Sequence, residues 1–327
     1  MPNPKAIFIP PNSVKYTLPS GDAISSVALG TAGKGESYAP TLAALKAGYR
    51  HIDSAWAYRG EAEVGQAIKD SGVPRSELWI TSKLWNSFHN PKDIEPVLDE
   101  SLKNLQTTYL DLYLIHWPVA RDPVTKKVDP ELTENEYVTW KKLEELVDKG
   151  KIRNIGVSNF NMRRLQDLAS NPLKYYPTIN QVELNYFNPQ PELLEWSKAN
   201  NILLEAYSPL GSDVQVKEAL SVPEVVEISK ELGISGAQVL LSWMHQRGVV
   251  VLPKTRNVNR VKENFELYRL PQAAFDKLEK AAISHPPQRV IDPSKALKID
   301  IFEDAAEKIR FEEWKQNRRQ DGMKSKL

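Results

Sequence analysis

Four side chains in the first third of the chain have the chemistry that proton transfer requires. Asp53 and Tyr58 lie in the stretch GYRHIDSAWAYRGEAEVG, Lys83 follows the apolar run LWITS, and His116 ends the run LDLYLIH. An unperturbed phenol, with a pKa of about 10, is a poor proton shuttle near neutrality. A nearby ammonium favours the phenolate, so we expect Lys83, paired with Asp53, to lower the pKa of Tyr58. A neutral His116 could hydrogen-bond a substrate oxygen or relay a proton to the phenol. Together the four residues could deliver a proton to a carbonyl oxygen.

Each of the four residues also has a structural interpretation. Asp53 could cap a helix beside a packed Tyr58, the pair of Lys83 and Asp53 could be a scaffold ion pair, and a histidine at a strand end is often a satisfied structural residue. The presence of all four types at neighbouring positions of the expected fold favours the chemical interpretation.

The elements that must position these residues alternate between strand and helix. Eight short apolar runs are expected strands: 27–29, 50–53, 78–82, 110–116, 152–157, 179–183, 203–207 and 249–252. Helical patterns follow them at 41–47, 61–71, 94–105, 136–149, 162–169, 191–200, 222–232 with 237–246, and 258–265. Runs without polar alternation indicate strands that are buried on both faces. Eight units predict an α/β fold, a closed (β/α)₈ TIM barrel, rather than an open doubly wound sheet.

Two further features complete the expected architecture. Residues 14–24 predict an N-terminal β-hairpin that turns at Pro19-Ser20-Gly21 and closes the bottom of the barrel. No linker or composition shift divides the chain, so we expect one domain over residues 1–327. In such barrels the chemistry lies where the strands end. The polar residues at those ends are Asp53, Lys83, His116, Ser158, Asn159, Gln181, Tyr207, Ser208 and Lys254.

Composition excludes several classes of function. The 327 residues are 41% hydrophobic with a net charge of +1, which gives no global field for nucleic acid or a membrane surface. The chain contains no cysteine, so it has no disulfide and no cysteine nucleophile. No run reaches the ~20 apolar residues of a membrane span, and the N-terminus lacks a secretory pattern. We expect a cytoplasmic protein. Five histidines without HxxxH or HxH spacing also predict no metal site.

Carbonyl reduction needs a hydride, and the sequence indicates where its donor binds. The glycine-rich GxGxxG pattern of a Rossmann site is absent. The stretch LPKTRNVNRVKEN instead gathers Lys254, Thr255, Arg256 and Arg260 between the last strand and its helix. Positive side chains at a helix N-terminus suit a phosphate. The alternative for this stretch is a solvated basic loop.

Three ordered stretches, GYRHIDSAWAYRGEAEVG, KIRNIGVSNF and LPKTRNVNRVKENFEL, carry a family resemblance. Through them the chain resembles the aldo-keto reductase family over nearly its whole length, and the fungal aldehyde, glycerol and xylose reductases within it. The resemblance implies NADPH-dependent reduction of carbonyl compounds in a (β/α)₈ barrel. It implies that Tyr58 is the general acid, that Asp53 and Lys83 tune it, and that His116 orients the carbonyl.

The resemblance also assigns the cofactor-binding residues. Gly30 and Thr31 line the expected cofactor-binding site, and Asp53 lies beside it. The groups that hold the nicotinamide carboxamide are Ser158, Asn159 and Gln181. The ring that stacks on the nicotinamide is Tyr207, and the pyrophosphate contacts are Ser208, Leu210 and Ser212. The 2′-phosphate contacts are Lys254, Thr255 and Arg260, with Glu263 and Asn264 beside the adenine. Arg256 replaces a residue that is often smaller, which favours NADPH over NADH.

The substrate site departs from the family pattern. Many relatives have tryptophan where this chain has Ala32, and the remaining candidate walls are Trp56, Trp85 and Trp117. We expect the segment after Ser284 to form a lip that sets specificity. Arg289 could contact a carboxylated or phosphorylated substrate, but we expect it to be a surface residue. The resemblance implies a small polar carbonyl such as glyceraldehyde or a sugar, or a broad range of carbonyl compounds, and a monomer or weak homodimer. The alternatives are a non-catalytic NADPH-binding barrel that acts as a sensor or partner subunit, and a metal-dependent barrel hydrolase.

Overall fold

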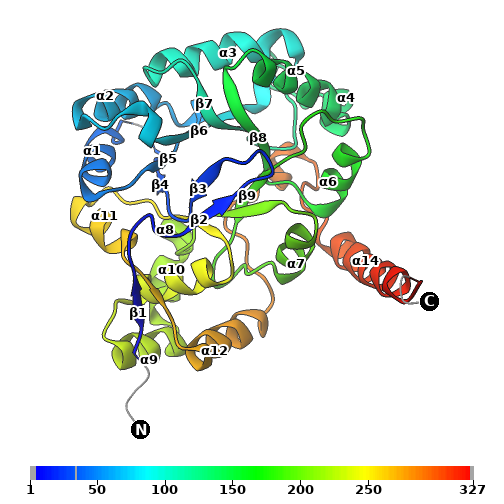
Figure 1. Cartoon of the computed structure of the whole chain (residues 1–327). Coiled ribbons are helices and arrows are strands. Elements are labelled where there is room, and N and C mark those ends of the chain that lie inside the picture. The colour runs from blue at the N-terminus through cyan, green and yellow to red at the C-terminus, as the bar shows by residue number, and fades with distance from the viewer. Residues whose placement is uncertain (1–4, 34, 325–327) are drawn as a thin grey trace.

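Eight parallel strands form the centre of the molecule, as a computed structural model shows (Figure 1). The structure describes residues 5–33 and 35–324, with side chains to residue 318. The first four residues, which belong to the stretch examined for a secretory pattern, lie outside this range. The eight strands are β4 (Leu29–Gly30), β5 (His51–Asp53), β6 (Trp79–Leu84), β7 (Leu110–Ile115), β8 (Ile152–Ser158), β9 (Ile179–Glu183), β10 (Leu203–Tyr207) and β11 (Val250–Leu252).

Backbone contacts between the first and last strands close this sheet into a barrel. Val27 forms a parallel bridge with Val251. The Ala28 N–H donates to the Val251 carbonyl at 2.9 Å, and the Val251 N–H donates to the Ser26 carbonyl at 2.9 Å. Every residue of β6 and β7 is buried, as expected for strands covered on both faces. The predicted (β/α)₈ barrel is therefore confirmed.

Helices surround the barrel in the expected order (Figure 1). The helices that follow the eight strands are α1 (Tyr38–Ala47), α2 (Glu61–Ser71), α3 (Pro91–Asn104), α5 (Glu136–Asp148), α6 (Met162–Ala169), α7 (Pro191–Ala199), α9 (Pro223–Leu232) with α10 (Gly236–Gln246), and α11 (Val258–Phe265). Residues next to the helices fix where some of them begin. Asn90 caps α3 ahead of Pro91, and Ser235 and Gln238 form a capping box on α10.

Several elements were not expected from the sequence. They are α4 (Pro130–Glu134), α8 (Ser212–Ser221), α12 (Gln272–Ile283), α13 (Ser294–Leu297), α14 (Asp304–Lys324) and a ribbon of β1 (Ile7–Ile9) with β12 (Leu267–Arg269). Most lie in loops or after the eighth unit, where the barrel pattern makes no prediction. The α14 helix extends away from the barrel in Figure 1. None of the helices within residues 5–33 and 35–324 combines the length and hydropathy that a membrane crossing requires.

The hairpin at the start of the chain lies where it was expected. Strands β2 (Lys15–Thr17) and β3 (Ala23–Ser25) pair antiparallel, and the Gly21 N–H donates to the Leu18 carbonyl at 2.9 Å across the turn. Leu18 and Ile24 pack against Trp79 and Leu112 near the amino ends of the barrel strands. This packing closes the bottom of the barrel and leaves the carboxyl ends of the strands as its open mouth.

Candidate active site

Three neighbouring strands bring Asp53, Lys83 and His116 to the mouth. Asp53 ends β5, Lys83 lies near the end of β6, and His116 directly follows β7. The Lys83 ammonium is fully buried and donates to Asp53 Oδ1 at 2.7 Å, to Asp53 Oδ2 at 2.9 Å and to the Ser54 carbonyl at 2.9 Å. A buried ammonium needs this compensation, since leaving it unpaired costs several kcal/mol.

The loop after β5 carries Tyr58 to this ion pair. Tyr58 ends a short 3₁₀ turn, Trp56–Tyr58, and the next residue, Arg59, has left-handed backbone with φ 60°. The Lys83 ammonium donates to the Tyr58 hydroxyl at 3.4 Å, a long contact, and lies 5.0 Å from the centre of the Tyr58 ring. The structure therefore brings the phenol, ammonium and carboxylate together.

Lys83 acts on the Tyr58 pKa in the expected direction, but it does not set the net shift. Burial raises the pKa of the Tyr58 hydroxyl, and the positive charge of Lys83 opposes this rise without cancelling it. For Lys83 itself, burial is the largest effect and lowers the pKa, but the interactions with Asp53, Tyr58 and Glu205 together outweigh it, so the net pKa is raised. Residue spacing in the sequence does not show how deeply Tyr58 is buried, so the effect of burial on its pKa could not be predicted. At neutral pH the phenol thus holds its proton next to a permanent cation.

His116 lies beside Tyr58 in the neutral state. Burial, with the charge of Lys83 and the proximity of His89, holds the pKa of His116 well below its usual range. The Tyr58 and His116 ring centres are 5.6 Å apart with the rings nearly perpendicular. A neutral imidazole can donate from one nitrogen and accept at the other, so it can donate a hydrogen bond to a carbonyl oxygen while it remains uncharged.

The ends of β8, β9 and β10 form a second polar group. Ser158 Oγ donates to the Gln181 carbonyl at 2.8 Å. Asn159 Nδ2 donates to the His116 carbonyl at 2.9 Å, and Asn159 Oδ1 accepts from the Tyr207 hydroxyl at 2.8 Å. The structure thus joins Ser158, Asn159 and Tyr207 through hydrogen bonds and links them to the backbone of His116.

The Gln181 amide connects this second group to the ion pair. Gln181 Nε2 donates to Asp53 Oδ2 at 2.8 Å and to Glu205 Oε2 at 2.8 Å. The latter residue was not among the predicted site residues. Thr31 also lies close, with its hydroxyl donating to the Asp53 carbonyl at 3.0 Å. Asp53 therefore contacts side chains from three other strand ends or loops, those of Thr31, Lys83 and Gln181.

Three residues predicted to contact the cofactor have strained backbone. Asn159, Ser208 and Ser212 have φ angles of 65°, 49° and 59°, in the left-handed region that side chains rarely adopt. Such conformations persist where the surrounding structure enforces them, often at functional sites. Leu210 lies between the latter two and packs partly buried against the main core.

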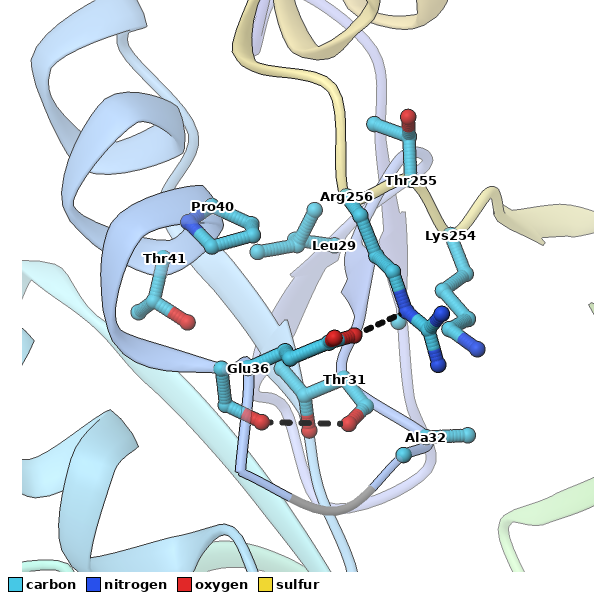
Figure 2. Close-up of a pocket in the computed structure, with 12 residues that line it drawn as sticks. Leu29, Thr31, Ala32, Glu36, Pro40, Thr41, Lys254, Thr255 and Arg256 are labelled. Carbon is cyan, nitrogen blue, oxygen red and sulfur yellow. Dashed lines mark hydrogen bonds and ion pairs between the residues drawn. The ribbon is translucent and has the colours of Figure 1, made fainter.

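The predicted phosphate site is a small pocket between β4 and β11, shown in Figure 2. Lys254, Thr255 and Arg256 line one side of it, and the other side is lined by Thr31, Ala32, Gly33, Glu36 and Ser37. Arg256 forms an ion pair with Glu36 across the pocket. A side chain at Gly33 would come within 3.5 Å of Lys254 Nζ. Cationic groups and a close backbone therefore converge on one small space.

Of the remaining predicted contacts, Gly30 lines this pocket and the others lie on the helix that follows it in the chain. Gly30 ends β4, and its N–H donates to the Pro253 carbonyl at 3.1 Å. Arg260, Glu263 and Asn264 lie on α11, which begins two residues after Arg256. Arg260 is exposed and Asn264 is buried, so only the former is free to reach a ligand without rearrangement.

Of the three tryptophans proposed as pocket walls, Trp85 and Trp117 lie at the mouth. The Trp85 ring centre is 5.2 Å from that of His116, and Trp117 packs against Phe302 of the C-terminal segment. Trp56 has different contacts. Its ring lies under the Arg59 guanidinium at 3.5 Å, and its indole N–H donates to Glu100 of α3 at 2.9 Å. The structure does not bring Trp56 to His116.

The segment after Ser284 returns across the mouth. The Val290 and Ile291 N–H groups donate to the Glu183 carboxylate at the end of β9, the closest at 2.7 Å. Arg289 was expected at the surface, and this expectation was wrong. Its side chain is only 11% exposed, lies over the Phe302 ring and pairs with Asp304 at 2.8 Å. Phe302 and Asp304 hold the Arg289 side chain against the protein, and both lie after the last barrel strand in the sequence.

Two other features bear on the site. A cavity of about 850 Å³ lies between the C-terminal segment and the loops after β8 and β9; Asn159 and Arg289 line it, but Tyr58 does not. Within residues 5–33 and 35–324, no group of three or more histidine, aspartate or glutamate side chains is arranged to hold a metal ion.

Comparisons with known proteins place these observations in context. The model of the Aldo/keto reductase family matches residues 28–283. A glycerol 2-dehydrogenase (NADP(+)) of Saccharomyces cerevisiae is 41% identical over 85% of this chain and 94% of its own length. An aldehyde reductase of the same yeast is 39% identical over 86% of this chain and 95% of its own.

Solved structures agree with the sequence comparisons. The aldose reductase of Schistosoma japonicum superposes with a TM-score of 0.81 at 32% identity, covering 88% of this chain and 98% of its own. An aldo-keto reductase of Bombyx mori, solved in complex with NADP, superposes with a TM-score of 0.80 at 32% identity over 90% of this chain and 99% of its own.

Proposed function

The chain belongs to the aldo/keto reductase family, and on this basis we propose that it reduces an aldehyde or ketone to an alcohol, with Tyr58 as the proton donor. It is an oxidoreductase that uses NADP(H), as its curated relatives do. The observation that carries the proposal is the buried Lys83 ammonium, held by Asp53 and in contact with the Tyr58 hydroxyl at the barrel mouth.

The residues at the mouth fit a phosphorylated dinucleotide. Lys254, Thr255 and Arg256 offer cationic and hydroxyl groups around one pocket, which suits the 2′-phosphate. Arg260 on the adjoining helix would add to this site, with Glu263 and Asn264 near the base. At the other end, Ser158, Asn159 and Gln181 present amide and hydroxyl groups that would hold the nicotinamide carboxamide, with Tyr207 stacked on the ring. Ser208, Leu210 and Ser212 would support the pyrophosphate between them.

Proton transfer follows from the electrostatics of the four residues. When bound, NADPH supplies the hydride. His116, neutral through burial, hydrogen-bonds the carbonyl oxygen and orients it toward Tyr58. Tyr58 holds its proton at neutral pH and donates it to that oxygen as negative charge develops there. Lys83 then stabilises the phenolate that remains, and Asp53 keeps the ammonium in place.

The surroundings favour a small carbonyl compound. Trp85 and Trp117 flank His116, and Phe302 closes the space beside Trp117. Two relatives of similar length are named for glycerol and for aldehydes. We therefore propose glyceraldehyde, related sugars and simple aldehydes as substrates, acted on by one barrel domain that spans the chain.

The proposal is tested with wild-type protein and the Tyr58→Phe variant. Loss of NADPH absorbance is followed with glyceraldehyde, xylose and aromatic aldehydes, and NADPH binding is measured by protein fluorescence. We expect turnover by the wild type, and binding without turnover by the variant. A wild type that binds NADPH but reduces no aldehyde would favour a sensor or partner subunit instead. A variant with a near-normal rate would remove Tyr58 from its role.

A further inference from the structure

A buried acid beneath the proposed catalytic residues has no role in the mechanism described so far. Glu205 lies in β10, fully buried, in register with Gln181 of β9. Its Oε2 accepts from Gln181 Nε2 at 2.8 Å. Its Oε1 is buried without a hydrogen-bond partner and lies 3.9 Å from His51 Nε2. An ionisable side chain is rarely buried unless it is paired or hydrogen-bonded, so the contacts of Glu205 need an explanation.

The contact with Gln181 constrains the orientation of that amide. Its nitrogen donates to two carboxyl groups, Asp53 from one side and Glu205 from the other, each at 2.8 Å. Rotating the amide by half a turn would place its carbonyl oxygen against the Asp53 carboxylate, which is repulsive, and would break the hydrogen bond that Glu205 Oε2 accepts. Gln181 is therefore held with its nitrogen inward, and Oε1 is directed away from both carboxyl groups.

The charges around Glu205 are consistent with a neutral acid. The groups that face it are Asp53 and His51 from β5, Lys83 from β6 and Gln181 from β9. Lys83 and Asp53 balance each other, and burial lowers the pKa of His51 to about 3, so this imidazole is neutral. Burial, with the charge of Asp53, raises the pKa of Glu205 to about 8. Near neutrality the amide is thus fixed without a net charge being added to the interior.

We propose that Glu205 is a positioning residue that fixes the Gln181 amide so that Oε1 is presented as an acceptor to the amino group of the nicotinamide carboxamide. This inference rests on the proposed function, because it assumes that the nicotinamide lies at the barrel mouth. It adds a residue that touches neither cofactor nor substrate and acts through Gln181 alone.

The test compares Glu205→Leu with Glu205→Gln, using two ligands. NADPH carries the nicotinamide, whereas 2′-monophosphoadenosine 5′-diphosphoribose carries the same phosphates without it. Leucine leaves one N–H of Gln181 without its partner, and the loss of one hydrogen bond predicts a roughly fivefold weaker Kd for NADPH. The Kd of the nicotinamide-free ligand should stay within about twofold. Glutamine still offers an oxygen to Gln181, so Glu205→Gln should bind NADPH like the wild type, within about twofold.

Two outcomes would overturn the inference: equal weakening of both ligands by Glu205→Leu, or unchanged NADPH binding in that variant. Should the leucine variant not fold, Glu205→Thr takes its place, since its shorter side chain also withdraws the acceptor and suits a strand. The wild type serves as the check on the proposed function. If the wild type binds no NADPH, the proposed function fails; if it binds NADPH and the variants do not discriminate between the ligands, only the role of Glu205 fails.

Discussion

Replacing Lys83 with methionine removes the positive charge that contacts the Tyr58 hydroxyl while keeping a side chain of similar length. The phenol should remain in place, because Tyr58 belongs to a 3₁₀ turn whose backbone hydrogen bonds do not involve Lys83. The proposed proton transfer leaves negative charge on the Tyr58 oxygen, and in the variant that charge forms without an adjacent cation. We therefore expect slower reduction by the Lys83→Met protein.

The size of this effect follows from the contact distance. A full phenolate and an ammonium separated by 3.4 Å interact by about 5 kcal/mol at an effective dielectric constant of about 20. Asp53 cancels part of the Lys83 field, and the proton is only partly transferred in the transition state. Taking half of the interaction gives about 2.5 kcal/mol, which corresponds to a roughly 70-fold fall in kcat/KM.

The assay must separate this electrostatic loss from a loss of folding. Lys83→Met leaves the Asp53 carboxylate buried and unpaired, which costs about 3–5 kcal/mol of folding stability. The double variant Asp53→Asn/Lys83→Met removes that unpaired charge and is the matched control. We expect thermal unfolding of the double variant to recover toward the wild type, while kcat/KM with glyceraldehyde stays low. Activity of Lys83→Met within about threefold of the wild type would refute the electrostatic argument, which requires a much larger loss.

Three further predictions concern other parts of the molecule. Arg256→Ala should weaken NADPH binding about tenfold and leave NADH binding nearly unchanged, because only NADPH carries the 2′-phosphate; fluorescence titration of both cofactors tests this. Burial lowers the pKa of His245 to about 4, below the value near 6.5 of the unfolded chain, so its neutral form contributes stability above pH 6.5 that is lost as pH falls toward 4. His245→Gln should therefore flatten the decline of the unfolding free energy over this range by about 3 kcal/mol in urea titrations, and an equal slope in both proteins would contradict the assignment. Gly65→Ala would place a methyl group 2.4 Å from the Asn104 carbonyl oxygen, where α2 crosses the end of α3, so the melting temperature should fall by several degrees for a cost of about 1–3 kcal/mol.

The positions of Asp53, Lys83 and His116 could be predicted because a repeating fold makes strand ends meet. Once alternating strands and helices indicate a parallel barrel, the residue after each strand must lie at the same mouth, whatever the separation in sequence. No comparable rule governs the segments outside the repeat. The ribbon of β1 with β12 joins residues 7–9 to residues 267–269, and Arg289 finds its partners through α14. These contacts depend on the path of the connecting loops in space, and local sequence patterns carry no information about that path.

The missed role of Glu205 has a different origin. The run LLEAY was interpreted as a buried strand, and that interpretation was correct, but a single glutamate within such a run is itself a signal, because burying it requires a partner. The sequence could not identify the partner, since Gln181 is brought opposite Glu205 by the strand register. The direction of the Tyr58 pKa shift shares this limit: Lys83 and Tyr58 were known from the sequence, whereas the burial that outweighs their attraction exists only in the folded barrel. Residue types therefore predicted which groups meet at the mouth, and burial and register decide the proton state and the orientation in which they meet.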